Sequence, residues 1–127
     1  MLIRYKKDLQ KIAMGLLSFM PELKEIKVLQ QTINEYEKNA NWHLYLWRDE
    51  DILGVIGVRI ENNEDAVIQH ISVNPSHRNL GIGRKMVEEI QKMFQGKLTV
   101  TPDGSTEEFF NKCLQNDEEK EQQANNE

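Results

Sequence analysis

The chain has 127 residues and a formal net charge of −5, with 29% charged and 39% hydrophobic residues. A chain of this length can bury one core but not two, and its composition is ordinary for a water-soluble globular domain. We therefore expect one domain over residues 1–115, followed by an acidic disordered tail over 116–127 that contains a single apolar residue, an alanine.

The charge and the cysteine count argue against several classes of protein. Residues 117–127 carry five acids and one lysine, which leaves the body near −1 and gives no general case for binding nucleic acid. Cys113 is the only cysteine, so no intramolecular disulfide can form. The histidines, His43, His70 and His77, show no metal-ligand spacing, and no metal is expected. No apolar stretch has the length of a membrane span, and no signal-peptide cleavage site follows the apolar run 12–20; we expect a cytoplasmic protein with no membrane partner.

The first third of the chain predicts a strand and two helices. Residues 1–6 alternate as a strand does, and Asp8 can cap a helix whose buried side carries Leu9, Ile12, Ala13, Leu16, Leu17 and Met20. Pro21 suits the first turn of a second helix with Leu23, Ile26, Leu29, Ile33 and Tyr36 at helical spacing.

The middle of the chain predicts three successive antiparallel strands. Residues 42–48 and 52–60 form a hairpin around the acidic turn 49–51, and a third strand opens at Val67. Gly54 and Gly57 mark bulges or close backbone approaches within the second strand. A further strand over 97–101 and a short helix over 105–114, capped by Asp103 or Ser105, complete an α+β order.

The stretch 67–85, VIQHISVNPSHRNLGIGRK, is where we expect the chemistry. Its apolar strand ends at Asn74-Pro75, and a helix begins after the turn that holds Gly81 and Gly83. The first turn of a helix leaves its N–H groups unpaired at the positive end of the dipole, and glycines let a bulky anion approach them. No third glycine completes a dinucleotide fingerprint, and no Gly-Lys-Ser/Thr completes a P-loop. A junction in which the glycines serve tight packing alone is the alternative.

The string VNPSHRNLGIG resembles the acetyl-CoA motif of the GCN5-related N-acetyltransferase (GNAT) superfamily, Arg/Gln-x-x-Gly-x-Gly/Ala after a strand and turn. The similarity extends over about residues 1–114. It implies a mixed, mostly antiparallel sheet flanked by helices. It also implies transfer of an acetyl group from acetyl-CoA, as co-substrate, to an amine acceptor. In the family the first two helices wall the acceptor cleft, so exposed members such as Phe19, Met20 or Tyr36 are candidate substrate contacts.

The resemblance also implies which residues hold the cofactor. The pantetheine arm would pair with the backbone of Ile71, Ser72 and Val73, and the N–H of Val73 would stabilise the oxyanion. The pyrophosphate would lie on backbone N–H groups of the turn and first helical residues, with help from the Arg78 side chain; these residues are Arg78, Asn79, Leu80, Gly81, Ile82, Gly83 and Arg84.

Catalytic side chains are less clearly marked. Many family members have a tyrosine after the fifth strand that protonates the CoA thiolate, and its position here is occupied by Phe110, with Cys113 nearby as a buried thiol. Gln69 and His70 are the candidate catalytic residues, with His70 as a general base, and strand alternation predicts them on opposite faces.

The chain also departs from the family at its end, where two closing strands are missing. The sheet is then short there, or a second subunit covers its edge as a homodimer. The opening MLIRYKKDLQKIAMGLLSFMP, the WHLYLW strand and this early stop resemble a small family member encoded with riboflavin-biosynthesis genes, which implies a link to that pathway. A non-catalytic CoA-binding regulatory or interaction module is the alternative function.

Overall fold

The computed structural model describes residues 1–113, and the predicted acidic tail lies outside the described residues. The strands are β1 (Leu2–Arg4), β2 (Trp42–Asp49), β3 (Asp51–Glu61), β4 (Asp65–Val73) and β5 (Thr99–Pro102). The helices are α1 (Gln10–Leu17), α2 (Ile26–Lys38) and α3 (Ile82–Phe94), with 3-10 turns η1 (Lys7–Leu9), η2 (Pro21–Leu23) and η3 (Pro75–His77). Residues 107–113 form a last helix, here the C-terminal helix.

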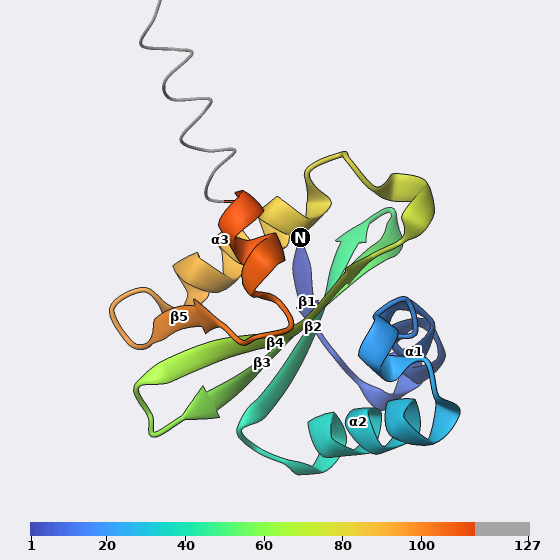
Figure 1. The fold of residues 1–127 in the computed structure, drawn as a ribbon, viewed down its shortest axis with the longest axis horizontal. Coiled ribbons are helices and arrows are strands. Elements are labelled where there is room, and N and C mark those ends of the chain that lie inside the picture. The colour runs from blue at the N-terminus through green and yellow to red at the C-terminus, as the bar shows by residue number, and fades with distance from the viewer. Residues whose placement is uncertain (114–127) are drawn as a thin grey trace, which may run out of the picture.

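The five strands form one sheet in the order β1-β2-β3-β4-β5, antiparallel except for the parallel β4–β5 pair. Helices α1 and α2 lie on one face of this sheet, and α3 and the C-terminal helix lie on the other (Figure 1). The predicted α+β class, with a mostly antiparallel sheet flanked by helices, is confirmed. Within residues 1–113, β5 is an edge strand, and no further strand follows it.

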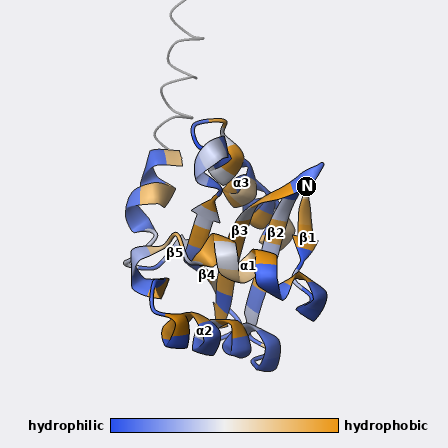
Figure 2. Ribbon diagram, turned by 90° about the vertical axis from the view of Figure 1, so that its right-hand side faces the viewer, coloured by the Kyte–Doolittle hydropathy of each residue, from blue (hydrophilic) through white to orange (hydrophobic). Residues whose placement is uncertain are grey.

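Each face of the sheet has its own apolar core. Leu17, Ile33 and Leu46 are fully buried between the sheet and α1–α2, while Ile56, Met86 and Ile90 are fully buried beneath α3. Apolar residues recur along the strands, and α2 carries both hydrophobic and hydrophilic residues, as a helix with one buried face does (Figure 2). Burial of these side chains from both sides holds the sheet as a central layer, because apolar area removed from water is the main favourable term in folding.

The two N-terminal helices differ in detail from the prediction. Asp8 lies inside η1 and makes no capping hydrogen bond to α1. Pro21 opens only a 3-10 turn, and α2 begins at Ile26. Ile12 and Ile26, expected on the buried stripes, are 46% and 65% exposed. Ile26 is exposed because it starts its helix, beyond the part of α2 that packs on the sheet, and Ile12 lies at the margin of the α1 stripe.

Strand β4 contains a β-bulge that changes the direction of its side chains. Gly57 pairs with His70 but the next residue, Val58, pairs with Ile68, so Gln69 is an extra residue on β4. A bulge interrupts the two-residue alternation of a strand. Consequently Ile68, Ile71 and Val73 all pack on the α3 side, while Gln69 and His70 both contact Tyr36 of α2. The expectation that Gln69 and His70 lie on opposite faces is therefore wrong.

Candidate functional site

Strands β4 and β5 separate at the point where the candidate site begins. Their pairing ends with Ile68 opposite Pro102, and the Ile68 carbonyl then accepts hydrogen bonds from the Asp103 N–H at 3.0 Å and from the Thr106 hydroxyl at 2.6 Å. The Asp103 carboxylate accepts the N–H groups of Ser105 and Thr106, which confirms Asp103 as a cap of the C-terminal helix. The chain therefore turns away from β4, which continues to Val73 with one side open.

The backbone groups that face this opening belong to Ile71 and Val73. The Asn74 N–H donates to the Leu53 carbonyl at 2.8 Å, so Asn74 and Leu53 form a hydrogen-bonded pair. In an antiparallel ladder such pairs alternate with non-hydrogen-bonded ones. Val73 opposite Gly54, and Ile71 opposite Ile56, are thus non-hydrogen-bonded pairs whose N–H and C=O groups point away from β3. Ser72 pairs with Val55 and presents its side chain, rather than its backbone, to the site.

The turn before α3 has the backbone shape that an anion cradle requires. Asn74 accepts the Ser76 N–H at 3.0 Å, which holds η3, and Asn79 and Gly81 then adopt left-handed conformations with φ of 67° and 78°. These turns direct the chain into α3, whose first-turn N–H groups have no intrahelical partner. Gly83 in that turn has no space for a Cβ, because such an atom would overlap the Phe109 ring.

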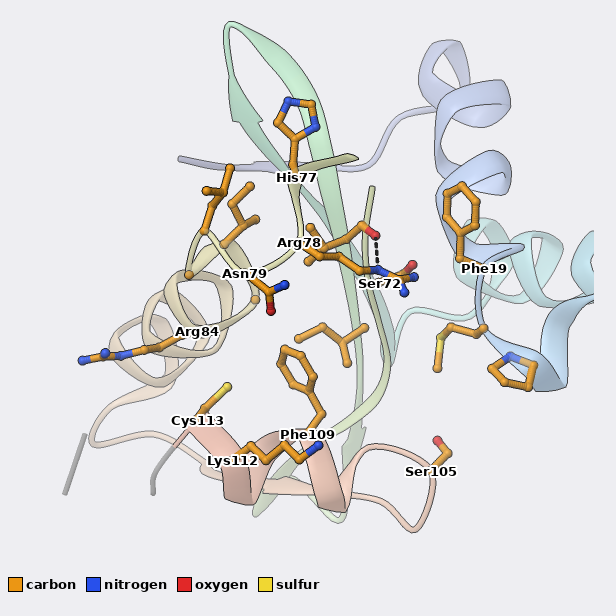
Figure 3. A pocket seen from close by; sticks show the side chains of 18 of the residues that line it. Phe19, Ser72, His77, Arg78, Asn79, Arg84, Ser105, Phe109, Lys112 and Cys113 are labelled. Carbon is orange, nitrogen blue, oxygen red and sulfur yellow. Dashed lines mark hydrogen bonds between the residues drawn. The ribbon is translucent and has the colours of Figure 1, made fainter. Parts of the chain in front are cut away.

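Cationic side chains are distributed unevenly around the cradle. Arg78 crosses the opening toward β4, where its Nε lies 3.5 Å from the Val73 carbonyl oxygen (Figure 3). Arg84 points away from the opening and pairs with Glu88 at 3.0 Å. Lys112 approaches from the C-terminal helix. Arg78 is therefore the side chain best placed to meet an anion, since Lys112 has Glu108 as a neighbour at 3.7 Å and Arg84 contributes through its place in the helix.

These elements enclose a cleft of about 1050 Å³. All ten cofactor-binding residues expected from the sequence line it: Ile71, Ser72, Val73, Arg78, Asn79, Leu80, Gly81, Ile82, Gly83 and Arg84. Phe19 and Met20, two of the candidate substrate contacts, line its other end together with Pro21 and Glu22. Tyr36, the third, is 7% exposed and does not line it.

The C-terminal helix contributes residues that the sequence did not indicate. Phe110, the residue at the expected tyrosine position, is 8% exposed and packs in the core beneath α3. Phe109, one residue earlier, instead turns its ring into the cleft (Figure 3). Ser105 and Lys112 also line it, and helical spacing from a cleft-facing Phe109 could have indicated Lys112. Cys113 is buried as expected; it borders the cleft, and burial raises the pKa of its thiol.

His70 and Gln69 do not line the cleft but belong to a polar network beside it. The Tyr36 hydroxyl lies 2.6 Å from His70 Nδ1 and accepts a hydrogen bond from Gln69 Nε2 at 2.9 Å. Gln69 Oε1 accepts from Arg59 at 3.2 Å, and Arg59 also approaches the Asp103 carboxylate at 3.7 Å. Gly57 leaves the space that the Tyr36 hydroxyl occupies beside β3, since a Cβ at this position would overlap that hydroxyl.

Burial sets the protonation of this network. It lowers the pKa of His70 to about 4, and it raises the pKa of Tyr36 above its usual value. His70 is therefore a neutral imidazole at neutral pH, and Tyr36 keeps its hydroxyl hydrogen. A proton relay by His70 near neutrality, which its unperturbed pKa suggested, does not agree with this environment.

The described residues contain no cluster of histidine, cysteine or acidic side chains able to hold a metal ion. In the same part of the chain, no helix has the length and apolar character needed to cross a membrane.

Comparison with known proteins gives one family and one fold. The model of the acetyltransferase (GNAT) family matches residues 9–113. An uncharacterized N-acetyltransferase in the lysA 3′ region of Bacillus methanolicus is 51% identical over 114 residues, which cover 89% of this chain and 94% of the relative.

Among solved structures, the aminoglycoside N-acetyltransferase AAC(6′)-Iy, in complex with a CoA bisubstrate analogue, matches with a TM-score of 0.67 at 17% identity, covering 90% of this chain and 85% of that one. A ribosomal-protein-alanine N-acetyltransferase from Brucella melitensis matches with a TM-score of 0.65 at 15% identity, covering 82% and 80%. At these identities the structures show a shared fold.

Proposed function

Because the chain belongs to the acetyltransferase (GNAT) family, we propose that it transfers an acetyl group from acetyl-CoA to an amine acceptor. One observation carries the proposal: the open side of β4 runs directly into the glycine turn at the start of α3. An extended pantetheine arm and its pyrophosphate need such a pair of sites, one offering strand-like hydrogen bonds and the next offering unpaired helix N–H groups.

In this arrangement the cofactor occupies the cation-lined half of the cleft. The pyrophosphate lies on the N–H groups between Arg78 and Arg84, with the Arg78 side chain released from the Val73 carbonyl to reach it. The pantetheine arm pairs with the backbone of Ile71 and Val73. The thioester then lies near the end of β4, where the Val73 N–H can donate to the oxygen that becomes negative during the reaction.

The reaction is attack by a neutral amine on the thioester carbonyl carbon. A C–N bond forms, the C–S bond breaks, and the proton lost by the amine balances the thiolate of CoA, which leaves as the thiol. Holding both reactants in one cleft removes much of the entropic barrier to their encounter. Gln69 is 5% exposed and fully engaged in its network, so we assign it a positioning role through Tyr36 and His70.

The acceptor enters from the other half of the cleft, beside η2. Phe19, Met20 and Pro21 make this end apolar, and Glu22 supplies one carboxylate that favours an amine. Structural relatives act on aminoglycosides, spermidine or ribosomal-protein alanine by their names. For this protein we propose an amine precursor of riboflavin as the first acceptor to test, in the cytoplasm, because of the resemblance of its opening and aromatic strand to a riboflavin-linked family member.

The test is a calorimetric titration of the protein with acetyl-CoA and CoA. We expect saturable binding that weakens about tenfold in Arg78→Gln, because a charge-assisted hydrogen bond contributes about 1.5–3 kcal/mol, part of which glutamine retains. Arg48→Gln, on the exposed end of β2 and outside the cleft, is the matched control and should bind as the wild type does. Absence of binding by the wild type would refute the proposal.

A non-catalytic CoA-binding module is the second candidate, and one observation favours it. No tyrosine is among the residues that line the cleft in the described part of the chain. Thiol release from acetyl-CoA in the presence of flavin-precursor amines, spermidine and an alanine-terminated peptide separates the two functions. CoA binding without acceptor-dependent thiol release would favour the module.

We also propose that two copies associate through β5. Its outer edge has no partner strand within residues 1–113, and an open edge pairs readily with another strand. Sedimentation analysis should then give a dimer at micromolar concentration. Val100→Pro, which removes a backbone donor directed away from β4 because the neighbouring Thr99 N–H donates to the Glu64 carbonyl, should shift it toward monomer, whereas a wild-type monomer at that concentration would contradict the proposal.

A further inference from the structure

The hydrogen bonds around His70 have a fixed direction. Gln69 is oriented by Arg59, whose guanidinium can only donate, so the Gln69 carbonyl oxygen faces Arg59 and its amide nitrogen faces Tyr36. The Tyr36 oxygen therefore accepts from Gln69. Its own hydrogen then needs an acceptor, because Tyr36 is 7% exposed and a buried hydroxyl without a partner is costly.

His70 Nδ1, at 2.6 Å, is the acceptor that the described residues offer to the Tyr36 hydroxyl. A nitrogen that accepts this bond carries no hydrogen, and a neutral imidazole has a single N–H. The hydrogen of His70 is therefore on Nε2. The chain of donors runs from Arg59 through Gln69 and Tyr36 to His70, and it ends in an N–H group.

The Nε2–H group of His70 is accessible on the face of the sheet that carries α1 and α2, where the acceptor substrate is proposed to enter. His70 Nε2 has no hydrogen-bond partner among the described residues, and it is not among their buried unpaired atoms, so it reaches solvent. Ser72, two residues further on the same face of β4, lines the cleft at about 7 Å along the strand. Glu22, at the apolar end of the cleft, is close enough for its charge to act on His70.

We propose that His70 donates its Nε2–H to a neutral oxygen of the acceptor substrate, an amide carbonyl or a hydroxyl next to the amine, rather than taking a proton from that amine. This inference rests on the transfer to an amine proposed above and names a feature of the acceptor. His70 is a specificity-determining residue in this arrangement, and Tyr36, Gln69 and Arg59 position it.

The charges facing His70 favour a neutral oxygen over a carboxylate. Glu22 of η2 and Asp103 after β5 are the acids that act on the ring, against Arg59 of β3 as the base; α2 and β2 present the uncharged Tyr36 and Trp42. A carboxylate bound at Nε2 would be repelled by Glu22, whereas the amine in the protonated form in which it arrives, before it loses the proton and attacks, would be attracted to it. The site thus suits an amine that carries an uncharged oxygen.

The first test is the hydrogen position on His70, measured by nitrogen-15 imidazole spectroscopy of the full chain at neutral pH without ligands. His43 is an internal reference, since its Nε2 lies 2.9 Å from the Ala40 carbonyl and must carry the hydrogen that this bond needs. We expect the same pattern for His70. Tyr36→Phe should give a mixture of tautomers, while Tyr45→Phe, which removes the hydroxyl near His43, should leave His70 unchanged. A hydrogen on Nδ1, or a protonated ring, would overturn the proposal.

The second test follows the His70 Nε2–H during titration of the CoA-bound protein with two probe amines. Alaninamide has an amide oxygen beside its amine, and isopropylamine lacks it. Alaninamide should shift the His70 signal at concentrations at which isopropylamine does not. No shift with alaninamide, or equal shifts with both, would refute the oxygen contact even if CoA binds, so this failure is distinct from failure of the acetyltransferase proposal.

The third test uses variants that separate a donor from a base. Glutamine keeps an N–H near the position of Nε2 but cannot act as a base. The affinity of His70→Gln for alaninamide should therefore lie within about threefold of the wild-type affinity. The affinity of His70→Ala should be about tenfold lower, because alanine has no donor. In acetyl transfer to alaninamide, His70→Ala should raise KM and leave kcat nearly unchanged. An equal collapse of kcat in both variants would identify proton transfer and overturn the donor role.

Discussion

Gly83→Trp is expected to abolish CoA binding, with an affinity loss of about 100-fold or more, equivalent to roughly 3 kcal/mol. Gly83 lies in the first turn of α3, where the proposed site gives a pyrophosphate direct access to backbone N–H groups, and even a Cβ there overlaps the Phe109 ring. An indole at this position fills the cradle itself. Calorimetric titration with CoA measures the effect.

Two further variants distinguish a filled cradle from a damaged fold. Gly15→Trp places the same side chain on the exposed surface of α1, where no atom lies within 4 Å of a Cβ, and should bind CoA normally. Gly83→Trp combined with Phe109→Ala removes the overlap but keeps the indole in the cradle, and should still fail to bind. Recovered binding in the double variant would show that displacement of Phe109, and not occupation of the cradle, caused the loss.

Gly57→Ala is expected to lower the free energy of unfolding by about 3 kcal/mol or more, the sum of overpacking and a broken buried hydrogen-bond network. The added methyl group overlaps the Tyr36 hydroxyl and forces Tyr36 away from His70 and Gln69. Urea unfolding followed by circular dichroism gives the value.

Gly15→Ala is the matched control for this substitution. Gly15 is exposed within α1 and its Cβ would meet no atom, so alanine there should raise the stability by about 0.5–1 kcal/mol through helix propensity. Equal stability of Gly57→Ala and the wild type would mean that Tyr36 does not need the space that the glycine leaves.

The residues that we propose for the cofactor could be predicted to lie together because they belong to one short segment whose local structure the sequence specifies. Pro75, Gly81 and the apolar repeat of α3 specify a strand, a turn and a helix in succession, and the cradle is made of backbone groups from that short segment. The cleft-facing side of the C-terminal helix was harder, since Phe109 and Phe110 are adjacent and only the packing of the helix decides which of them reaches the cleft.

The acceptor half depends on a feature that the sequence does not mark. Alternation predicts that Gln69 and His70 point to opposite faces, and the bulge at Gln69 overrides it. Gly57 gave a partial signal, since a glycine inside a strand indicates a bulge or a close approach. The partner that approaches it, Tyr36, is distant in the chain and belongs to α2, so only tertiary structure connects the two.

The bulge in β4 also gives this strand one residue more than its pairing with β3 requires. Before Gln69 the even-numbered residues of β4 face α3, as Ile68 does. After Gln69 the odd-numbered residues face α3, as Ile71 does. Deleting the codon of Gln69 would restore regular pleating between Ile68 and His70 and leave Ile71 and Val73 on the α3 side, so the core would keep its residues and the Tyr36 network would lose one. The extra residue is therefore needed by the polar network and not by the sheet, and loss of this single codon should affect the surroundings of His70 without unfolding β4.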